Sequence, residues 1–157
     1  MDKCLLCLKN NADKKKSHII PKFLKTILNR NNAENHLLYF DVESQKHIKK
    51  QDLAWEDNIL CTDCENRISI TENYAARSFF HRFHKLQYRN CFKSHPGMIK
   101  ESIYLNMELF NLFILSVIFR CSISKRKDFK SFILPAEYHE KIRRDLNDNL
   151  LNKLIDY

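Results

Sequence analysis

Apolar residues recur at helical spacing in the middle of the chain. From Cys61 onward they lie three, four or seven residues apart, at Ile68, Ala75, Phe79, Phe83 and Leu86. This spacing places side chains on one face of an α-helix. The pattern predicts a long helix that begins at Cys61.

The C-terminal half predicts two further helices. Residues 99–124 are largely apolar, but their uninterrupted part, residues 112–119, is far shorter than the roughly 20 residues of a membrane span. We therefore expect a buried core helix and no membrane association. After a polar joint, Pro135 suits the first turn of a last helix. Its apolar positions lie four residues apart, at Tyr138, Ile142, Leu146 and Leu150.

The N-terminal third predicts smaller elements. Residues 1–11 suggest a short knuckle, and an apolar run before Pro21 leads into a short helix that ends at the turn signal of residues 29–32. Residues 36–50 alternate around a polar turn, which predicts a two-stranded hairpin. Because one Gly and three Pro are few chain breakers, the chain is expected to be mostly helical.

Length and composition fit an ordinary globular protein. The 157 residues, 44% hydrophobic and 29% charged, suit one domain or a small domain with an appendage. We expect residues 1–90 to form a motif-bearing domain. Residues 91–157 are expected to be a helical extension packed on it, so that the two parts make one compact unit.

The cysteines include two Cys-x-x-Cys pairs, Cys4 with Cys7 and Cys61 with Cys64. The N-terminus shows no apolar signal-peptide core, so a reducing cytoplasmic environment is expected. There, paired cysteines indicate a metal site rather than disulfides. Zn²⁺ favours four tetrahedral thiolate ligands, and we predict one structural zinc per chain. The alternatives are chance pairs without metal, or a redox role for one pair.

The two pairs are separated by 53 residues, positions 8–60, which is longer than a simple zinc ribbon. The spacing suits a hairpin insertion between a knuckle and a helix, the arrangement called a treble clef. The second pair then lies at a helix N-terminus, where free N–H groups and the helix dipole stabilise thiolate. The other two cysteines, Cys91 and Cys121, are expected to be buried apolar residues.

Two further motifs accompany the cysteine pairs. Residues 17–21 read Ser-His-Ile-Ile-Pro, and residues 60–65 read Leu-Cys-Thr-Asp-Cys-Glu. Together with the knuckle they resemble the HNH nucleases, the ββα-metal family, and more narrowly its small bacterial members with a Ser-His-Ile-Ile-Pro core. Residues 109–122 are similar to the helical extension of those proteins. The resemblance covers most of the chain.

The resemblance implies an α+β, mostly helical fold with a zinc-stabilised treble-clef or ββα core and a C-terminal helical extension. It implies a metal-dependent endonuclease that hydrolyses phosphodiester bonds, with an association with phage defence by family analogy. At the position of His18 the family has its general base, which takes a proton from water. A second divalent cation, Mg²⁺ or Mn²⁺ by our expectation, stabilises charge on the phosphate.

The sequence departs from the family pattern at the implied catalytic metal. Ser17 stands where the family has Asp or His, and Glu65 stands where it has His or Asn. A carboxylate at Glu65 can still bind a hard cation. Glu65 also fits a capping box with Thr62, which is the structural alternative. Glu72, two turns further on, is expected to be a solvated helix residue rather than another ligand.

The residue that orients the base in the family falls just before the second cysteine pair. Glu56 is closest to the usual offset, and Asn58 has the usual side-chain chemistry. Both therefore remain candidate catalytic residues beside His18 and Glu65.

The chain is basic, with 27 Lys and Arg against 19 Asp and Glu. This surplus indicates an anionic partner, nucleic acid and foremost DNA, or serves solubility alone. Candidate phosphate contacts lie beside the histidine motif and on the long helix, at Lys14, Lys15, Lys16, Arg77, Arg82 and Lys85. Hairpin lysines add to this charge, and no feature predicts base-specific readout.

A different function is compatible with the same motifs. The chain can be a catalytically inactive, zinc-stabilised module that binds nucleic acid. It can also be a subunit that docks a protein partner through its helical extension, where apolar residues are concentrated.

Overall fold

The structure is a computed structural model, and it describes residues 2–29, 36–41, 44–81, 92–94, 100–102 and 106–152. The strands are β1 (Ser17–His18), β2 (Leu37–Asp41), β3 (Lys46–Lys50), β4 (Trp55–Glu56), β5 (Phe92–Ser94) and β6 (Lys100–Ser102). The helices are α1 (Phe23–Leu28), α2 (Thr62–Ala75), α3 (Met107–Ile123) and α4 (Ala136–Asn152), with a π-helix η1 (Ala76–His81) and a 3-10 helix η3 (Lys127–Phe129). The expected α+β class is confirmed, and about half of the chain is helical.

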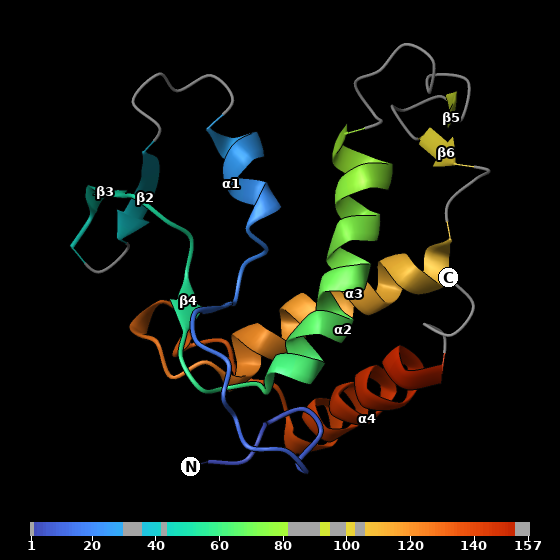
Figure 1. Ribbon diagram of the computed structural model, residues 1–157. Coiled ribbons are helices and arrows are strands. Elements are labelled where there is room, and N and C mark those ends of the chain that lie inside the picture. Colours follow the sequence, from blue (N-terminus) through green and yellow to red (C-terminus); the bar gives the residue numbers. More distant parts are fainter. Residues whose placement is uncertain are drawn as a thin grey trace.

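The core lies where α2, α3, α4 and the N-terminal knuckle meet. Figure 1 shows α3 crossing α2, with α4 beneath them and the N-terminal segment beside α4. Each element contributes a fully buried side chain, namely Leu6, Ile68, Phe119 and Leu146. The helical C-terminal residues therefore share one hydrophobic core with the cysteine motifs.

Helix α3 begins later than the sequence predicts. The expected helix from residue 99 is wrong, because α3 starts at Met107 and residues 100–102 form β6, antiparallel to β5. The Asn106 side chain accepts hydrogen bonds from the backbone N–H groups of Glu108 and Leu109, both at 3.1 Å. Asn is a preferred N-cap, so the start of α3 is fixed locally.

Helix α3 is a core helix, as expected. One face is buried, at Leu109, Leu112, Phe113, Ser116, Phe119, Arg120 and Cys121. In the part of the chain that the structure describes, no helix has the length and apolar character needed to cross a membrane. Cys121 is buried as predicted, whereas Cys91, Phe83 and Leu86 lie outside the described residues.

Helix α4 follows Pro135, and its predicted apolar face is packed only in part. Leu146 is fully buried and Ile142 is half-buried, but Tyr138 is 56% exposed. The Arg143 guanidinium donates to the carbonyl oxygen of Leu6 at 2.8 Å. This bond fastens α4 to the N-terminal knuckle.

The predicted hairpin is confirmed as an antiparallel β2–β3 pair. Its register runs from Leu37 opposite Lys50 to Asp41 opposite Lys46. The hairpin is inserted between β1 and β4, which pair with each other. In Figure 1 it stands apart from α2 and α4.

Candidate functional site

The first cysteine pair lies on a tight turn at the N-terminus. The backbone N–H of Leu8 donates to the carbonyl oxygen of Cys4 at 2.9 Å, and Leu8 has a φ of 58°. This left-handed conformation is unfavourable for a residue with a branched side chain. The N–H of Leu5 donates to the carbonyl oxygen of Ile59 at 3.0 Å. The turn is thereby held against the segment that carries the second pair.

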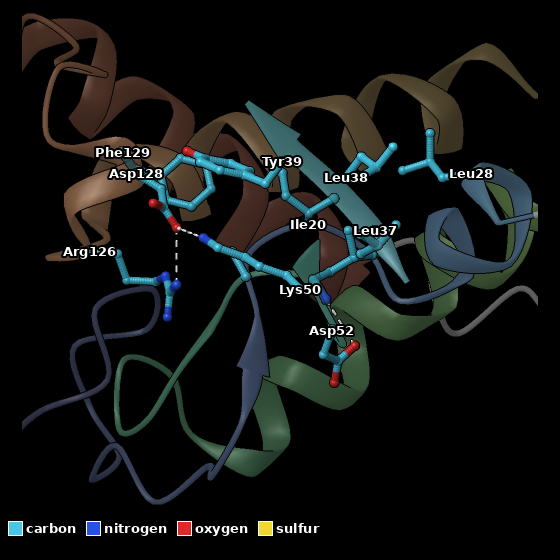
Figure 2. A pocket seen from close by; sticks show the side chains of 12 residues that line it. Ile20, Leu28, Leu37, Leu38, Tyr39, Lys50, Asp52, Arg126, Asp128 and Phe129 are labelled. Carbon is cyan, nitrogen blue, oxygen red and sulfur yellow. Dashed lines mark hydrogen bonds and ion pairs between the residues drawn. The ribbon is translucent and has the colours of Figure 1, made fainter. Parts of the chain in front are cut away.

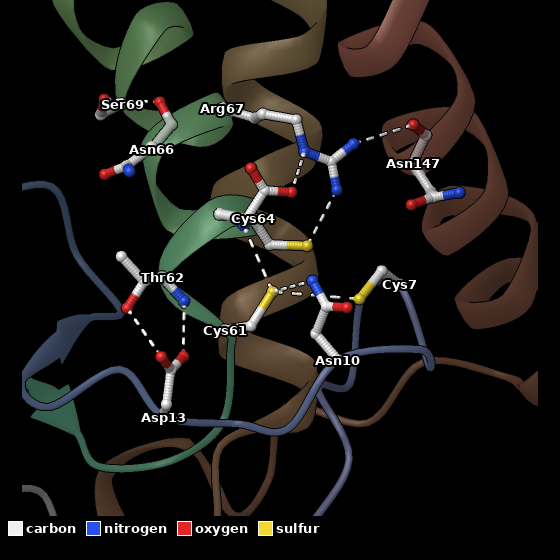
Figure 3. Close-up of polar contacts among 11 residues, drawn as sticks. Cys7, Asn10, Asp13, Cys61, Thr62, Cys64, Asn66, Arg67, Ser69 and Asn147 are labelled. Atoms are coloured by element: carbon white, nitrogen blue, oxygen red, sulfur yellow. Dashed lines mark hydrogen bonds and ion pairs between the residues drawn. The ribbon is translucent and has the colours of Figure 1, made fainter.

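The second pair lies at the start of α2. Cys61 is the N-cap, and its Sγ accepts from the backbone N–H of Cys64 at 3.4 Å. The Asp13 carboxylate accepts from the N–H of Thr62 at 2.7 Å and from its hydroxyl at 3.2 Å (Figure 3). Asp13 and Cys61 therefore cap α2, and Glu65 makes a different contact, described below.

The four thiols converge at one point. The Sγ atoms of Cys4, Cys7, Cys61 and Cys64 all lie within 4.8 Å of one another, and three of these residues are buried. A tetrahedral ion with Zn–S bonds of about 2.3 Å requires sulfurs roughly 3.8 Å apart. The distance between the Sγ atoms of Cys7 and Cys61 is 3.9 Å. The cluster fits a structural metal such as zinc.

Polar donors surround the sulfurs. The Arg67 guanidinium donates to Sγ of Cys64 at 2.9 Å and also to the carbonyl oxygen of Asn147 on α4 at 3.3 Å. The Asn10 amide donates to Sγ of Cys61 at 3.7 Å (Figure 3). Such contacts stabilise thiolate and orient metal ligands. They also tie the cluster to α4.

The thiols perturb one another's ionisation. A hydrogen bond with Cys64 is the main reason why the pKa of the Cys4 thiol is lowered. The same bond raises the pKa of Cys64, and burial is the main cause of the raised pKa of Cys61. A negative charge is therefore most easily held on Cys4, and binding of a metal requires the other thiols to release protons as well.

The histidine motif lies on β1, which runs antiparallel to β4. Ser17 is opposite Glu56, and His18 is opposite Trp55. Ser17 is buried, and its hydroxyl donates to Oε2 of Glu65 at 2.7 Å. Two residues 48 positions apart in the sequence are thus brought together beside the cysteine cluster.

His18 is held through its backbone. Its carbonyl oxygen accepts from Nη1 of Arg120 at 2.6 Å, while its Nε2 is buried and has no hydrogen-bond partner among the residues described. Arg120, only 1% exposed, also forms an ion pair of 2.5 Å with Glu72. The expectation that Glu72 is a solvated surface residue is wrong, because its carboxylate compensates the buried guanidinium.

Glu56 and Asn58, the two candidates for orienting the base, lie on different elements. Glu56 lies on β4, and its carboxylate accepts from the hydroxyl of Ser124 at 2.7 Å and from the N–H of Lys125 at 3.1 Å. Asn58 lies in the following loop with a φ of 58°, and its N–H donates to the carbonyl oxygen of Lys14 at 2.9 Å. Glu56 therefore lies in the strand that pairs with β1, whereas the described contact of Asn58 is made by its backbone.

The predicted basic residues fall in two regions. Lys15 and Lys16 are exposed and Lys14 is half-buried, and Nζ of Lys16 lies 5.6 Å from the ring centroid of Trp55. This places the lysine run beside β4. Arg77 is exposed on η1. Arg82 and Lys85 lie outside the described residues.

Three residues that position the site were not predicted from the sequence. Asp13, Arg67 and Arg120 each contact a residue that is distant in the chain, namely Thr62, Asn147 and His18. The one signal for Arg120 is a charged residue directly after the apolar run of residues 112–119, since a buried charge requires a partner.

Comparisons with known proteins found no match to this chain. No protein-family model matches the chain, and neither the curated proteins nor the solved structures gave a match. Functional conclusions for this chain therefore rest on its own residues.

Replacing Arg67 is expected to weaken metal retention. In Arg67→Gln the hydrogen bond to Sγ of Cys64 loses its charge, and loss of an outer contact of this kind costs roughly 10- to 100-fold in metal affinity. Competition with a chromogenic chelator measures this change. Arg77→Gln, which alters an exposed arginine, is the matched control, and equal metal affinity of the two variants would contradict the role of Arg67.

Glycine is expected to suit the knuckle at position 8 better than any residue with a Cβ. The free energy of unfolding of Leu8→Gly should be about 1 kcal/mol larger than that of Leu8→Ala, because glycine adopts a positive φ without steric cost. Denaturant unfolding of the metal-loaded variants measures the difference. The comparison with alanine removes the effect of the lost leucine side chain, and equal stability would show that the turn does not constrain φ.

Proposed function

We propose that this protein is a metal-dependent endonuclease of the HNH type, with His18 as general base. The observation that supports the proposal is the bond of 2.7 Å between Ser17 and Glu65. It joins the histidine strand to the helix start beside the cysteine cluster. In the HNH family the catalytic groups lie on these two elements, the histidine strand and the start of the helix.

The cysteine cluster binds one Zn²⁺ per chain in this proposal. Four thiolates are a closed ligand set, which is typical of a structural zinc rather than a catalytic one. The ion fastens the knuckle to the N-terminus of α2. It thereby fixes the distance between β1 and the helix that carries Glu65.

A second cation, Mg²⁺ or Mn²⁺, would be held by the carboxylate of Glu65 with the hydroxyl of Ser17 beside it. Oxygen ligands suit these hard cations, and the ion when bound would supply charge stabilisation at the phosphate. The imidazole of His18 accepts a proton from water. The water oxygen then forms a bond to phosphorus as the bond to the leaving ester oxygen breaks.

The surroundings of His18 support a fixed base. Arg120 holds its carbonyl oxygen, and Glu72 neutralises that arginine. A fixed backbone suits this role, since a base must be held in position relative to its water.

Nucleic acid, foremost DNA, is the proposed substrate. The chain carries a formal net charge of +8, and Lys15 and Lys16 are exposed directly before the histidine strand. Lysines near a reacting phosphate hold the backbone, and binding should weaken steeply with added salt. A place in cytoplasmic phage defence follows from the family resemblance alone.

A second candidate function is binding without catalysis. Ser17 and Glu65 are bonded to each other, and the Glu56 carboxylate is already engaged by Ser124 and Lys125. A site with its oxygen atoms committed in this way fits a zinc-stabilised module that binds nucleic acid. Exposed apolar residues before and on α4, Ile133 and Tyr138, favour the related possibility of docking a protein partner.

His18→Ala decides between catalysis and binding. With Mg²⁺, Mn²⁺ or Ni²⁺, the wild type is expected to cleave supercoiled plasmid, single-stranded DNA or RNA, and the variant to lose at least about 100-fold in rate. Equal zinc content and circular dichroism of the two proteins control for folding. Cleavage that persists in the variant would exclude His18 as the base, and salt-sensitive binding without cleavage by either protein would support the second function.

The carboxylate of Glu65 is expected to be required for the catalytic cation. Glu65→Gln keeps an oxygen that accepts from Ser17, so the fold should remain, but it removes the negative charge that binds Mg²⁺ or Mn²⁺. We expect at least a tenfold rise in the cation concentration for half-maximal cleavage, as measured in a metal titration. An unchanged titration would mean that Glu65 serves the fold only.

A further inference from the structure

The β2–β3 hairpin has one face that is anchored to the protein. On that face Nζ of Lys50 lies 3.9 Å from the ring centroid of Tyr39 and 3.3 Å from the carboxylate of Asp128. Arg126 binds the same carboxylate at 3.0 Å (Figure 2). These contacts connect the hairpin to the segment after α3. The hairpin is therefore fixed in orientation, with its other face directed away from this anchor.

The other face is formed by Leu38, Phe40, His47 and Lys49, which we call the outer hairpin face. Side chains alternate between the two faces of a strand, and the register pairs Leu38 with Lys49 and Phe40 with His47. Leu38 is 68% exposed and Phe40 is 49% exposed. The rings of Phe40 and His47 are in contact, with centroids 5.2 Å apart. The outer hairpin face thus presents an aromatic pair to solvent.

Positive charge surrounds this aromatic pair. Strand β3 reads Lys-His-Ile-Lys-Lys, and its residues 46–49 are exposed. Strands β2 and β3 contain one acidic residue, Asp41, whose carboxylate accepts a hydrogen bond from the Ser44 hydroxyl at 2.8 Å. A ligand that complements this face needs flat apolar groups together with negative charges.

We propose that the outer hairpin face binds single-stranded nucleic acid, with a base stacked on Phe40 and phosphates held by Lys49 and its neighbours. Aromatic side chains within a basic surface are the usual means of holding unpaired bases. A duplex keeps its bases inside the stack, so it cannot use the ring of Phe40. An aliphatic protein surface would not match the positive charge of β3.

The position of the hairpin relates this surface to the candidate catalytic site. His47 of the outer hairpin face is followed after eight residue steps by Trp55, which lies opposite His18. Eight steps span at most about 29 Å. A strand bound on the outer hairpin face is therefore held within a few nucleotides of β1. The inference deepens the proposed function, since it names the class of substrate that would be held there.

The test measures binding of a fluorescent single-stranded oligonucleotide by anisotropy, in a His18→Ala background that prevents cleavage. Phe40→Ala is expected to weaken binding about 5- to 100-fold, the range found for loss of one stacked base. Phe40→Trp should retain the affinity. Phe132→Ala is the matched control, because Phe132 is 40% exposed but lies outside the hairpin, and its affinity should be unchanged.

An abasic oligonucleotide of equal length separates stacking from charge. It keeps the phosphates, so the protein with Phe40 should bind it as weakly as Phe40→Ala binds the normal oligonucleotide. Phe40→Ala itself should bind both with similar affinity. Equal affinity of the Phe40 protein for the two oligonucleotides, or for duplex and single strand, would overturn the inference. So would self-association that Phe40→Ala abolishes without any binding of nucleic acid.

Failure of the inference and failure of the proposed function give different results. If wild type cleaves DNA and Phe40→Ala binds and cleaves equally well, the endonuclease stands and the outer hairpin face has no part in it. If no cleavage is found but binding of the oligonucleotide depends on Phe40, the inference about the outer hairpin face is supported. The second candidate function, binding without catalysis, is then supported as well.

Discussion

The convergence of four cysteine sulfurs is the constraint on which the other parts of the structure depend. It joins the first residues of the chain to the start of α2 and closes a loop that contains β1, the hairpin and β4. Four thiolates repel one another without a cation, so the geometry is stable when a metal such as zinc neutralises them. Closing so long a loop also lowers the conformational entropy of the unfolded chain. This entropy loss rises only slowly with the length of the loop. The histidine strand is positioned as a consequence, because it lies inside this loop.

Arg120 provides a second connection, from α3 to the same strand. Burying a guanidinium is expensive unless every polar atom around it is matched. Here Glu72 supplies the opposite charge, and the carbonyl oxygens of His18 and Ser116 accept hydrogen bonds from Nη1 and Nε of Arg120. The ion pair thus links α2, α3 and β1 at one point, next to the residue proposed as base. The helical C-terminal part is in this way a support for the site and not only a neighbour of it.

Features with a local signal were predictable from the sequence, and features that depend on distant contacts were not. The cysteine spacing, the hairpin alternation and Pro135 predicted the cysteine cluster, β2–β3 and the start of α4. The start of α3 was misplaced because residues 100–102 pair with β5, and three-residue strands are too short to show a pattern. The cap by Asp13, the bond from Ser17 to Glu65 and the pair of Arg120 with Glu72 each join distant positions. No local rule specifies such partners, since folding of the whole chain decides them.

X-ray absorption at the zinc edge, on protein purified without chelator, tests most directly whether the four cysteines bind zinc. One zinc per chain with four sulfur neighbours at about 2.3 Å is the predicted result. A first shell that contains nitrogen or oxygen, or protein that is folded and free of metal, would contradict the closed thiolate site. In that case the positions of β1 and α2 would have to be explained by packing alone.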